Sequence, residues 1–311
     1  MIFSLTLHPE NNNDETDRME NEKIGMVLEG GGMRGMYTCG ILDVLMENRI
    51  YVDGMVGVSA GIAFGCNYKS RQIGRALRYN ARFAKDKRYS GIGSLLKTGN
   101  YYNAWFAYHL VPTHYDVFDY NTFEDSPMEC YAVCFDVNNG EGVYQRLDHV
   151  DNDFFEWIRA SASMPVVAKP VEVGGRLLLD GGLADSIPLE FMMKKGYSRN
   201  VVVLTREEGY RKTAERGMWL MKHLLRKYPR VIEALQHRPA LYNKQLQFVR
   251  EQERKGTAFV FRPMKPLDVS RTTHDPMEMD RVYQQGRDEA MQRLDELKKF
   301  LANEDTAASD E

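Results

Sequence analysis

The 311-residue sequence has few cysteines and no long hydrophobic stretch. Its four cysteines form no C-x-x-C pair and have no histidine nearby at ligand spacing, which excludes a disulfide scaffold and predicts reduced, mostly buried thiols in a cytoplasmic protein. The longest charge-free stretch of the core, residues 54–68, has 15 residues, whereas a membrane-spanning helix needs about 20. The start, MIFSLTLHPENNN, lacks a basic region and makes a poor signal peptide.

The net charge is also small, at −3, but the charges are unevenly distributed. Residues 1–22 carry a net charge of −5 and residues 303–311 a net charge of −4, and we expect an acidic leader and tail that are both disordered. The intervening residues 23–302 hold 40 basic and 34 acidic side chains. The folded body is therefore mildly basic, so the overall balance does not exclude an anionic partner.

The middle of the chain alternates short apolar strands with helical patterns. Strand, glycine loop, helix, strand, tight turn and helix follow one another from Ile24 to about Ser70, the order of a mainly parallel sheet. Asn139-Gly140 predicts a hairpin. We expect a three-layer α/β/α domain over residues 23–205 and a C-terminal extension, residues 206–302, that adds helices and one strand to the same sheet. Further strands are expected at 176–179, 201–204 and 258–261, and further helices at 154–163, within 206–255 and at 277–301.

Residues 57–61 read Gly-Val-Ser-Ala-Gly and follow an apolar strand. In this G-x-S-x-G pattern, a glycine two residues on either side of Ser59 permits a sharp strand-to-helix turn that points the Ser59 Oγ outward. The helix that begins at Ala60 directs its first N–H groups toward the same centre. Ser59 is therefore the candidate nucleophile.

A second glycine pattern, Gly30-Gly31-Gly32-Met33-Arg34-Gly35, also lies between a strand and a helix. As G-x-G-x-x-G it could bind a dinucleotide, with Asp53 following Gly35 by 18 residues. Alternatively, three consecutive glycines expose backbone N–H groups that could bind an oxyanion. The serine turn after the next strand favours the oxyanion interpretation. We call residues 30–35 the glycine loop.

A nucleophilic serine needs a base, and the strand at 176–179 is followed by Asp180-Gly181-Gly182. Catalytic groups in open α/β sheets gather at the carboxyl ends of the strands, which makes Asp180 a candidate. Asp185 is a second candidate, whose alternative role is that of a turn residue bonding the backbone before Ile187. Asp180 is favoured because it follows the apolar strand directly.

Four motifs in this order resemble those of patatin-like phospholipases: G-G-G-x-[RK]-G, G-x-S-x-G, A-S-x-x-x-P and D-G-G/A. They stand here at residues 30–35, 57–61, 160–165 and 180–182. Each motif alone is weak, but the ordered set, spread over about residues 24–204, is specific. The chain resembles a bacterial-type, single-domain member of that family with a C-terminal extension.

The resemblance implies a serine acyl hydrolase that cleaves the acyl esters of phospholipids or lysophospholipids through an acyl-enzyme intermediate. Ser59 is then the nucleophile and Asp180 the general base. The oxyanion would be bound by backbone N–H groups of Gly30, Gly31, Gly32 and Ala60. The remaining motif positions are Arg34, Gly35, Gly57, Gly61, Gly181 and Gly182. Because an aspartate has a pKa of about 3.9 in water, it can act as this base only if it directly hydrogen-bonds the Ser59 Oγ in a partly dry site.

Three other interpretations stay open. The order Ser59, Asp180, His274 matches a Ser-His-Asp esterase, although Ser59 follows only the second strand and His274 lies in a polar loop. The chain could also be a catalytically silent lipid-binding or regulatory protein. Finally, the acyl group could be transferred to an acceptor other than water. No metal-ligand spacing occurs, so we expect neither a metal nor a cofactor, and nothing indicates a nucleic-acid partner.

Two features could recognise lipid. Arg71, Arg75, Arg78 and Arg82 recur at helical spacing, which suggests one face that either attracts anionic head groups at a membrane surface or is simply solvated. Residues 89–123 contain ten aromatic side chains, which could form an acyl-binding cap or an interfacial patch, or pack in the core.

Three further residues accompany the motifs. Arg34 could steady the glycine loop, meet a phosphate, or form a salt bridge at the helix start. Ser161 and Ser163 are expected to pack the end of a helix beside the site rather than react.

Overall fold

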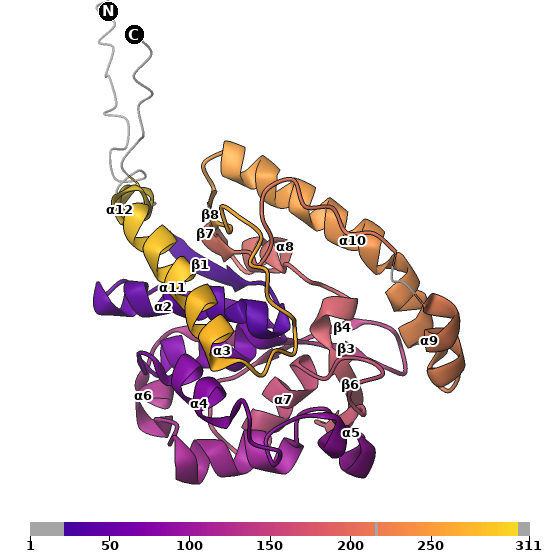
Figure 1. Cartoon of the computed structure of the whole chain (residues 1–311). Helices are drawn as coiled ribbons and strands as arrows, with labels where there is room; N and C mark the ends of the chain where they lie inside the picture. Colours follow the sequence, from indigo (N-terminus) through magenta and orange to yellow (C-terminus); the bar gives the residue numbers. More distant parts are fainter. Residues whose placement is uncertain (1–21, 215–216, 304–311) are drawn as a thin grey trace, which may run out of the picture.

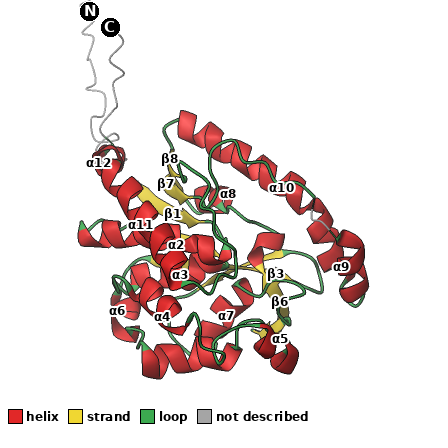
Figure 2. Cartoon of the chain, in the orientation of Figure 1, coloured by secondary structure: helices red, strands yellow, loops and turns green. Residues whose placement is uncertain are grey.

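The computed structural model describes residues 22–214 and 217–303. The expected disordered ends, 1–22 and 303–311, lie almost entirely outside these ranges. In the described residues, an eight-stranded mixed sheet lies between two layers of helices (Figures 1 and 2), which confirms the predicted α/β class. No helix in the described ranges has both the length and the apolar character needed to cross a membrane.

The sheet has the strand order β5-β6-β3-β2-β1-β7-β8, and β4 pairs with the outer edge of β3. The neighbours β3, β2, β1, β7 and β8 run parallel, so the C-terminal extension does contribute one strand, β8, to the same sheet. The strands β4, β5 and β6 are antiparallel to their neighbours, and β5 had no signal that we recognised. The bounds are β1 (Lys23–Leu28), β2 (Gly54–Val58), β3 (Glu129–Asp136), β4 (Gly142–Arg146), β5 (Val171–Val173), β6 (Arg176–Asp180), β7 (Tyr197–Val203) and β8 (Ala258–Phe261).

Helices from both halves of the chain cover the two faces of the sheet (Figure 1). The first face is covered by α2 (Gly35–Glu47), α3 (Ala60–Lys69), α7 (Phe154–Ser161), α11 (Pro276–Gln292) and α12 (Leu294–Ala302). The second face is covered by α8 (Leu189–Lys194) and α10 (Pro229–Arg254), with α9 (Met218–Leu224) beside the start of α10. The remaining helices are α4 (Arg75–Phe83), α5 (Ile92–Thr98), α6 (Tyr120–Asp125), the π-helical segment η2 (Phe106–Tyr115) and the short turns η1 (Gly32–Arg34) and η3 (Gly181–Leu183).

Two of the helical predictions needed correction. The expected helix at 277–301 is divided at Arg293 into α11 and α12. The expected helix within 206–255 begins later, because residues 206–214 are irregular.

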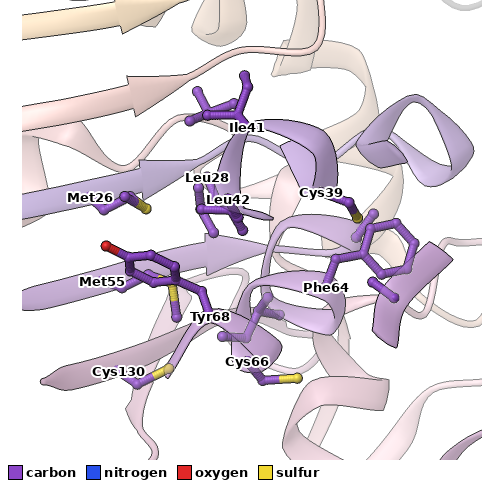
Figure 3. Close-up of a cluster of buried hydrophobic side chains, with 14 of the residues drawn as sticks. Met26, Leu28, Cys39, Ile41, Leu42, Met55, Phe64, Cys66, Tyr68 and Cys130 are labelled. Carbon is purple, nitrogen blue, oxygen red and sulfur yellow. The ribbon is translucent and has the colours of Figure 1, made fainter. Parts of the chain in front are cut away.

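Alternation along the strands explains why the sheet is buried on both faces. Met26 and Leu28 of β1 pack into the core beneath α2 and α3, whereas Val27 between them packs against the helices of the other face. Successive side chains of a strand point to opposite faces, so each apolar run supplies both cores. Figure 3 shows the first core, where Met26, Leu28 and Met55 of the strands meet Leu42 of α2 and Tyr68 of α3.

A close approach of α2 and α11 ties the C-terminal extension to the first half of the domain. A Cβ added to Gly40 would lie 2.1 Å from the Tyr283 carbonyl oxygen, and one added to Gly286 would lie 2.1 Å from the Tyr37 carbonyl oxygen. Two hydrogen bonds between side chains flank this contact. Tyr37 donates to Glu289 (2.7 Å) and Tyr283 donates to Asp43 (2.6 Å). The two helix backbones can touch only because both positions lack a side chain.

We therefore expect Gly286→Ala to lower the free energy of unfolding by about 1–3 kcal/mol, because the added methyl group forces α11 away from α2. Gly93→Ala in α5 is the matched control, since a Cβ there meets nothing within 4 Å, and it should change stability by less than about 1 kcal/mol. Urea unfolding of both variants measures the difference. Equal stabilities would mean that the contact between the two helices is not tight.

Candidate active site

Ser59 occupies a strained turn between β2 and α3. Its backbone has φ 56° and ψ −123°, a conformation that a residue with a side chain rarely adopts. A Cβ on Gly57 would lie 2.6 Å from the Ile62 nitrogen, and a Cβ on Gly61 would lie 2.4 Å from the Leu28 carbonyl oxygen. Both glycines of the motif are therefore required by the tightness of the turn.

A hydroxyl from α7 holds this turn in place. The backbone N–H of Ser59 donates to the Ser161 Oγ (2.9 Å), and that hydroxyl donates to the Val133 carbonyl of β3 (2.6 Å). Ser163 bonds the Arg159 carbonyl instead (2.8 Å). The prediction that both serines pack the helix end is confirmed, and Ser161 in addition links the helix to the backbone of Ser59.

The glycine loop lies beside Ser59 and is fixed from outside. The Thr205 hydroxyl donates to the Gly30 carbonyl (3.1 Å), and the Met33 N–H donates to the Arg271 carbonyl (3.1 Å). Gly32 has φ +57°, and a Cβ there would lie 2.5 Å from that same Arg271 carbonyl oxygen. The loop is therefore preorganised by Thr205 at the end of β7 and by the segment before α11.

Asp180 lies close to Ser59, but for a different reason from the one that the sequence suggested. The strand β6 is antiparallel to β3, and its last residue, Asp180, pairs with Cys134. Val58 pairs with Val133, the residue before Cys134, on the same edge of β3, so this register brings Asp180 next to the residue that follows Val58. The argument from the carboxyl edge of a parallel sheet was wrong for β6, although the residue it selected does reach the site.

The Asp180 carboxyl group is buried, and the groups that favour its charge offset the effect of burial only in part. Burial raises its pKa above the ordinary value, whereas the Arg238 charge, a hydrogen bond from the Ser59 hydroxyl and the Gly182 N–H (2.8 Å) all lower it. Arg271 lowers it further. The carboxylate is thus in contact with the hydroxyl of the candidate nucleophile and is supplied with donors and positive charge.

Two pockets meet at Ser59. The first, which we call the acyl pocket, is lined mainly by apolar and aromatic side chains from α3, α4, η2 and α7. The second, the basic pocket, contains Asp180, the first glycines of the loop and several arginines. Both are lined by Gly32, Ser59, Met164 and Arg271. An ester bond at Ser59 would therefore have an apolar space on one side and a polar, cationic space on the other.

The aromatic side chains of the segment at 89–123 are divided between a pocket and the core. Tyr89, Tyr102 and Tyr108 line the acyl pocket, whereas Phe118 and Phe123 are buried in the main core. The segment therefore forms one wall of the pocket, and its buried phenylalanines anchor this wall in the core of the domain.

Only three of the four arginines of the predicted face lie on a helix, and all three bond the segment at 115–116. Arg71 precedes α4, which begins only at Arg75. Arg75 is buried, and its guanidinium and that of Arg78 both bind the Asp116 carboxylate (3.4 Å and 2.7 Å). Arg82 donates to the last carbonyl of η2. Through these bonds to Asp116 and to a backbone carbonyl, the arginines connect α4 to the C-terminal end of η2 and the residue that follows it.

His274 is engaged away from Ser59. Its Nε2 bonds the Tyr101 hydroxyl (2.6 Å) and its Nδ1 bonds the Ala84 carbonyl (2.7 Å). Since both ring nitrogens already have partners, neither is available to bond Ser59 or Asp180, and this geometry disfavours a Ser-His-Asp triad.

Asp185 lies outside both pockets. Tyr144 and Gln245 each donate to its carboxylate at 2.7 Å, and burial raises its pKa to about 6. It connects β4 to α10, so its alternative role as a structural residue fits the structure better.

Three of the four arginines of the basic pocket had no signal in the sequence, Arg34 being the exception. Arg206 follows β7, Arg238 lies on α10 and Arg271 lies before α11. In a charged helix such as α10, one inward arginine cannot be distinguished from its solvated neighbours. The described residues contain no group of three or more His, Cys, Asp or Glu side chains that could hold a metal ion.

Comparisons with known proteins agree with the motifs. The family model described as "Patatin-like phospholipase" matches residues 26–193, and that of a domain of unknown function, DUF6363, matches residues 228–302. The second model covers the part of the chain in which we recognised no motif. A solved structure, VipD from Legionella pneumophila, is similar over 88% of this chain and 67% of that one, with 13% identity and a TM-score of 0.42.

Curated relatives match part of the chain. A lysophospholipase NTE1 of Yarrowia lipolytica is 28% identical over 203 residues, 60% of this chain and 13% of that protein. That of Debaryomyces hansenii is 30% identical over 185 residues, 57% of this chain and 11% of that protein. The alignments thus span only about an eighth of these relatives' length. Since the family model covers more than half of the sequence, the chain belongs to the patatin-like phospholipase family, and this membership implies a lipid acyl hydrolase.

Proposed function

We propose that the protein hydrolyses the acyl esters of phospholipids or lysophospholipids through Ser59 and Asp180. One observation carries the proposal: a serine in a strained turn contacts a buried carboxylate at the junction of an apolar and a cationic pocket. The lysophospholipase names of two relatives support the substrate class.

In the first step, the Ser59 Oγ attacks the carbonyl carbon of the ester while its proton passes to the Asp180 carboxylate. The hydroxyl of a free serine is a weak nucleophile, and a hydrogen bond to a base in a water-poor site activates it as the new C–O bond forms. The acyl chain would occupy the acyl pocket and the alcohol portion the basic pocket. Collapse of the tetrahedral intermediate expels the alcohol, which takes the proton from Asp180, and leaves Ser59 acylated.

The negative charge on the tetrahedral oxygen requires fixed donors. Gly30, Gly31 and Gly32 line the basic pocket together with Ser59, and Ala60 begins α3 directly after it, so their backbone N–H groups would supply these donors. The bonds from Thr205 and to Arg271 keep the loop from rearranging, so these donors need not reorganise during the reaction. Water, activated by Asp180, would then cleave the acyl-enzyme.

Ser59→Ala and Asp180→Asn should each lower kcat/KM for a lysophospholipid by about 10³-fold or more, because the first removes the attacking hydroxyl and the second removes the carboxylate that accepts its proton. The wild-type protein should be labelled at Ser59 by a fluorophosphonate, and Ser59→Ala should not. Circular dichroism checks that both variants stay folded.

Asp185→Asn is the matched control for Asp180→Asn, since it changes another buried aspartate of the same segment. It should retain activity within about tenfold. Near-normal turnover by Asp180→Asn, or a stronger loss in Asp185→Asn, would refute the assignment of the base.

His274→Gln separates the dyad from a triad. The dyad predicts a loss of less than about tenfold, because the two ring nitrogens of His274 bond Tyr101 and the Ala84 carbonyl, whereas a catalytic histidine would cost about 10⁴-fold. Steady-state hydrolysis of one ester by both proteins measures this difference.

The pH dependence should report Asp180. Activity requires the carboxylate, so kcat/KM should fall as the pH drops through the Asp180 pKa, which burial raises above its ordinary value. Arg238→Gln removes a charge that lowers this pKa, so the acid limb should move to higher pH, whereas Arg254→Gln at the exposed end of α10 should leave it in place. An identical acid limb in all three proteins would exclude Asp180 as the titrating group.

A further inference from the structure

The basic pocket contains more positive than negative charge. Four arginines and one lysine line it, against only two carboxylates. Its charged lining residues are Glu29, Arg34, Asp180, Arg206, Lys212, Arg238 and Arg271. A pocket of this composition, open beside Ser59, attracts an anionic group.

Neither carboxylate forms an ion pair with the arginines, although the Asp180 charge interacts with Arg238 and Arg271 and the Glu29 charge with Arg34. Glu29 accepts from the Thr205 N–H (2.6 Å) and the Tyr242 hydroxyl (2.7 Å), so it links β1 to β7 and α10. Asp180 is bound by the Gly182 N–H and by Ser59. In the described part of the chain, none of the four arginines of the pocket forms an ion pair with an acid.

Arg34 shows the imbalance most clearly. Its side chain is only 8% exposed, yet its Nε has no hydrogen-bond partner among the described residues. Burial, together with the charges of Arg206 and Arg271, lowers its pKa to about 10, and the Glu29 charge opposes this only in part. A buried donor without a partner is costly, so a ligand that accepts from it would be stabilised.

We propose that the basic pocket binds the phosphate of the substrate's alcohol portion, an inference that rests on the proposed ester hydrolysis at Ser59. The planar guanidinium group presents parallel donors that match phosphate oxygens, and converging arginines hold such an anion better than a single one. The ester bond would then lie at Ser59 between the acyl chain and the phosphate. Arg206, Arg238 and Arg271 all lie beyond the stretch matched by the patatin family model, so the later part of the chain supplies the selectivity.

Substrate selectivity tests this proposal directly. We compare kcat/KM for octanoyl-glycerol phosphate, which carries a phosphate, with that for octanoyl-glycerol, which carries none, using one acyl chain for both. Arg206→Gln and Arg271→Gln should lower the ratio of the two values about 10- to 100-fold, the cost of a lost charge-assisted hydrogen bond. Arg254→Gln should leave the ratio unchanged, since that side chain is exposed at the far end of α10. An unchanged ratio in both pocket variants would refute the proposal.

A binding measurement separates this inference from the proposed reaction. Calorimetry with Ser59→Ala protein compares glycerol phosphate, glycerol and inorganic phosphate. Glycerol phosphate should bind at least about tenfold more tightly than glycerol, and Arg206→Gln should remove that advantage. If the wild-type protein cleaves no ester and takes no fluorophosphonate label, the proposed reaction fails, yet selective binding of glycerol phosphate would still support the pocket. If only inorganic phosphate binds, or nothing does, the pocket does not recognise a phosphate-bearing alcohol, whatever the activity.

Discussion

The arrangement of the site depends on keeping one buried carboxylate charged. Asp180 has little access to water, and burial alone would favour its neutral form, which cannot accept a proton from Ser59. The compensation comes from the Ser59 hydroxyl, the Gly182 N–H and the positive charges of Arg238 and Arg271. Two of these four groups belong to the C-terminal extension, so the strands that precede Ser59 and Asp180 form one electrostatic unit with the extension.

This dependence explains why the extension is joined so firmly to the first half of the chain. The strand β8 lengthens the parallel sheet, α11 touches α2 at two glycines, and α10 passes over the carboxyl ends of β1 and β7. The Arg271 carbonyl holds the glycine loop, while its side chain lines both pockets. An independently mobile extension could not hold these groups within hydrogen-bonding distance of the loop.

The sequence predicted the local features well, because each left a local signature. The strands β1 and β2 showed apolar runs, and the glycines around Ser59 reflect a turn in which any Cβ would clash. The position of Asp180 was predicted from an argument that fails, since β6 is antiparallel and only its register with β3 brings Asp180 to Ser59. The arginine face at 71–82 was wrong because helical spacing says nothing about where a helix starts, or whether an acid such as Asp116 lies opposite.

The distribution of charge along the sequence and its distribution in space lead to different conclusions about where an anion would bind. The basic residues around Arg75 are engaged by protein groups, because Arg75 and Arg78 share the Asp116 carboxylate and Arg82 donates to the Tyr115 carbonyl. The surplus that lacks acidic partners lies instead at Arg34, Arg206, Arg238 and Arg271, which are far apart in the sequence. No window along the sequence contains them together, and only the fold brings them to one pocket. The net charge of a region is therefore a poor guide to where this protein would bind an anion, because pairing and burial decide which cations remain available.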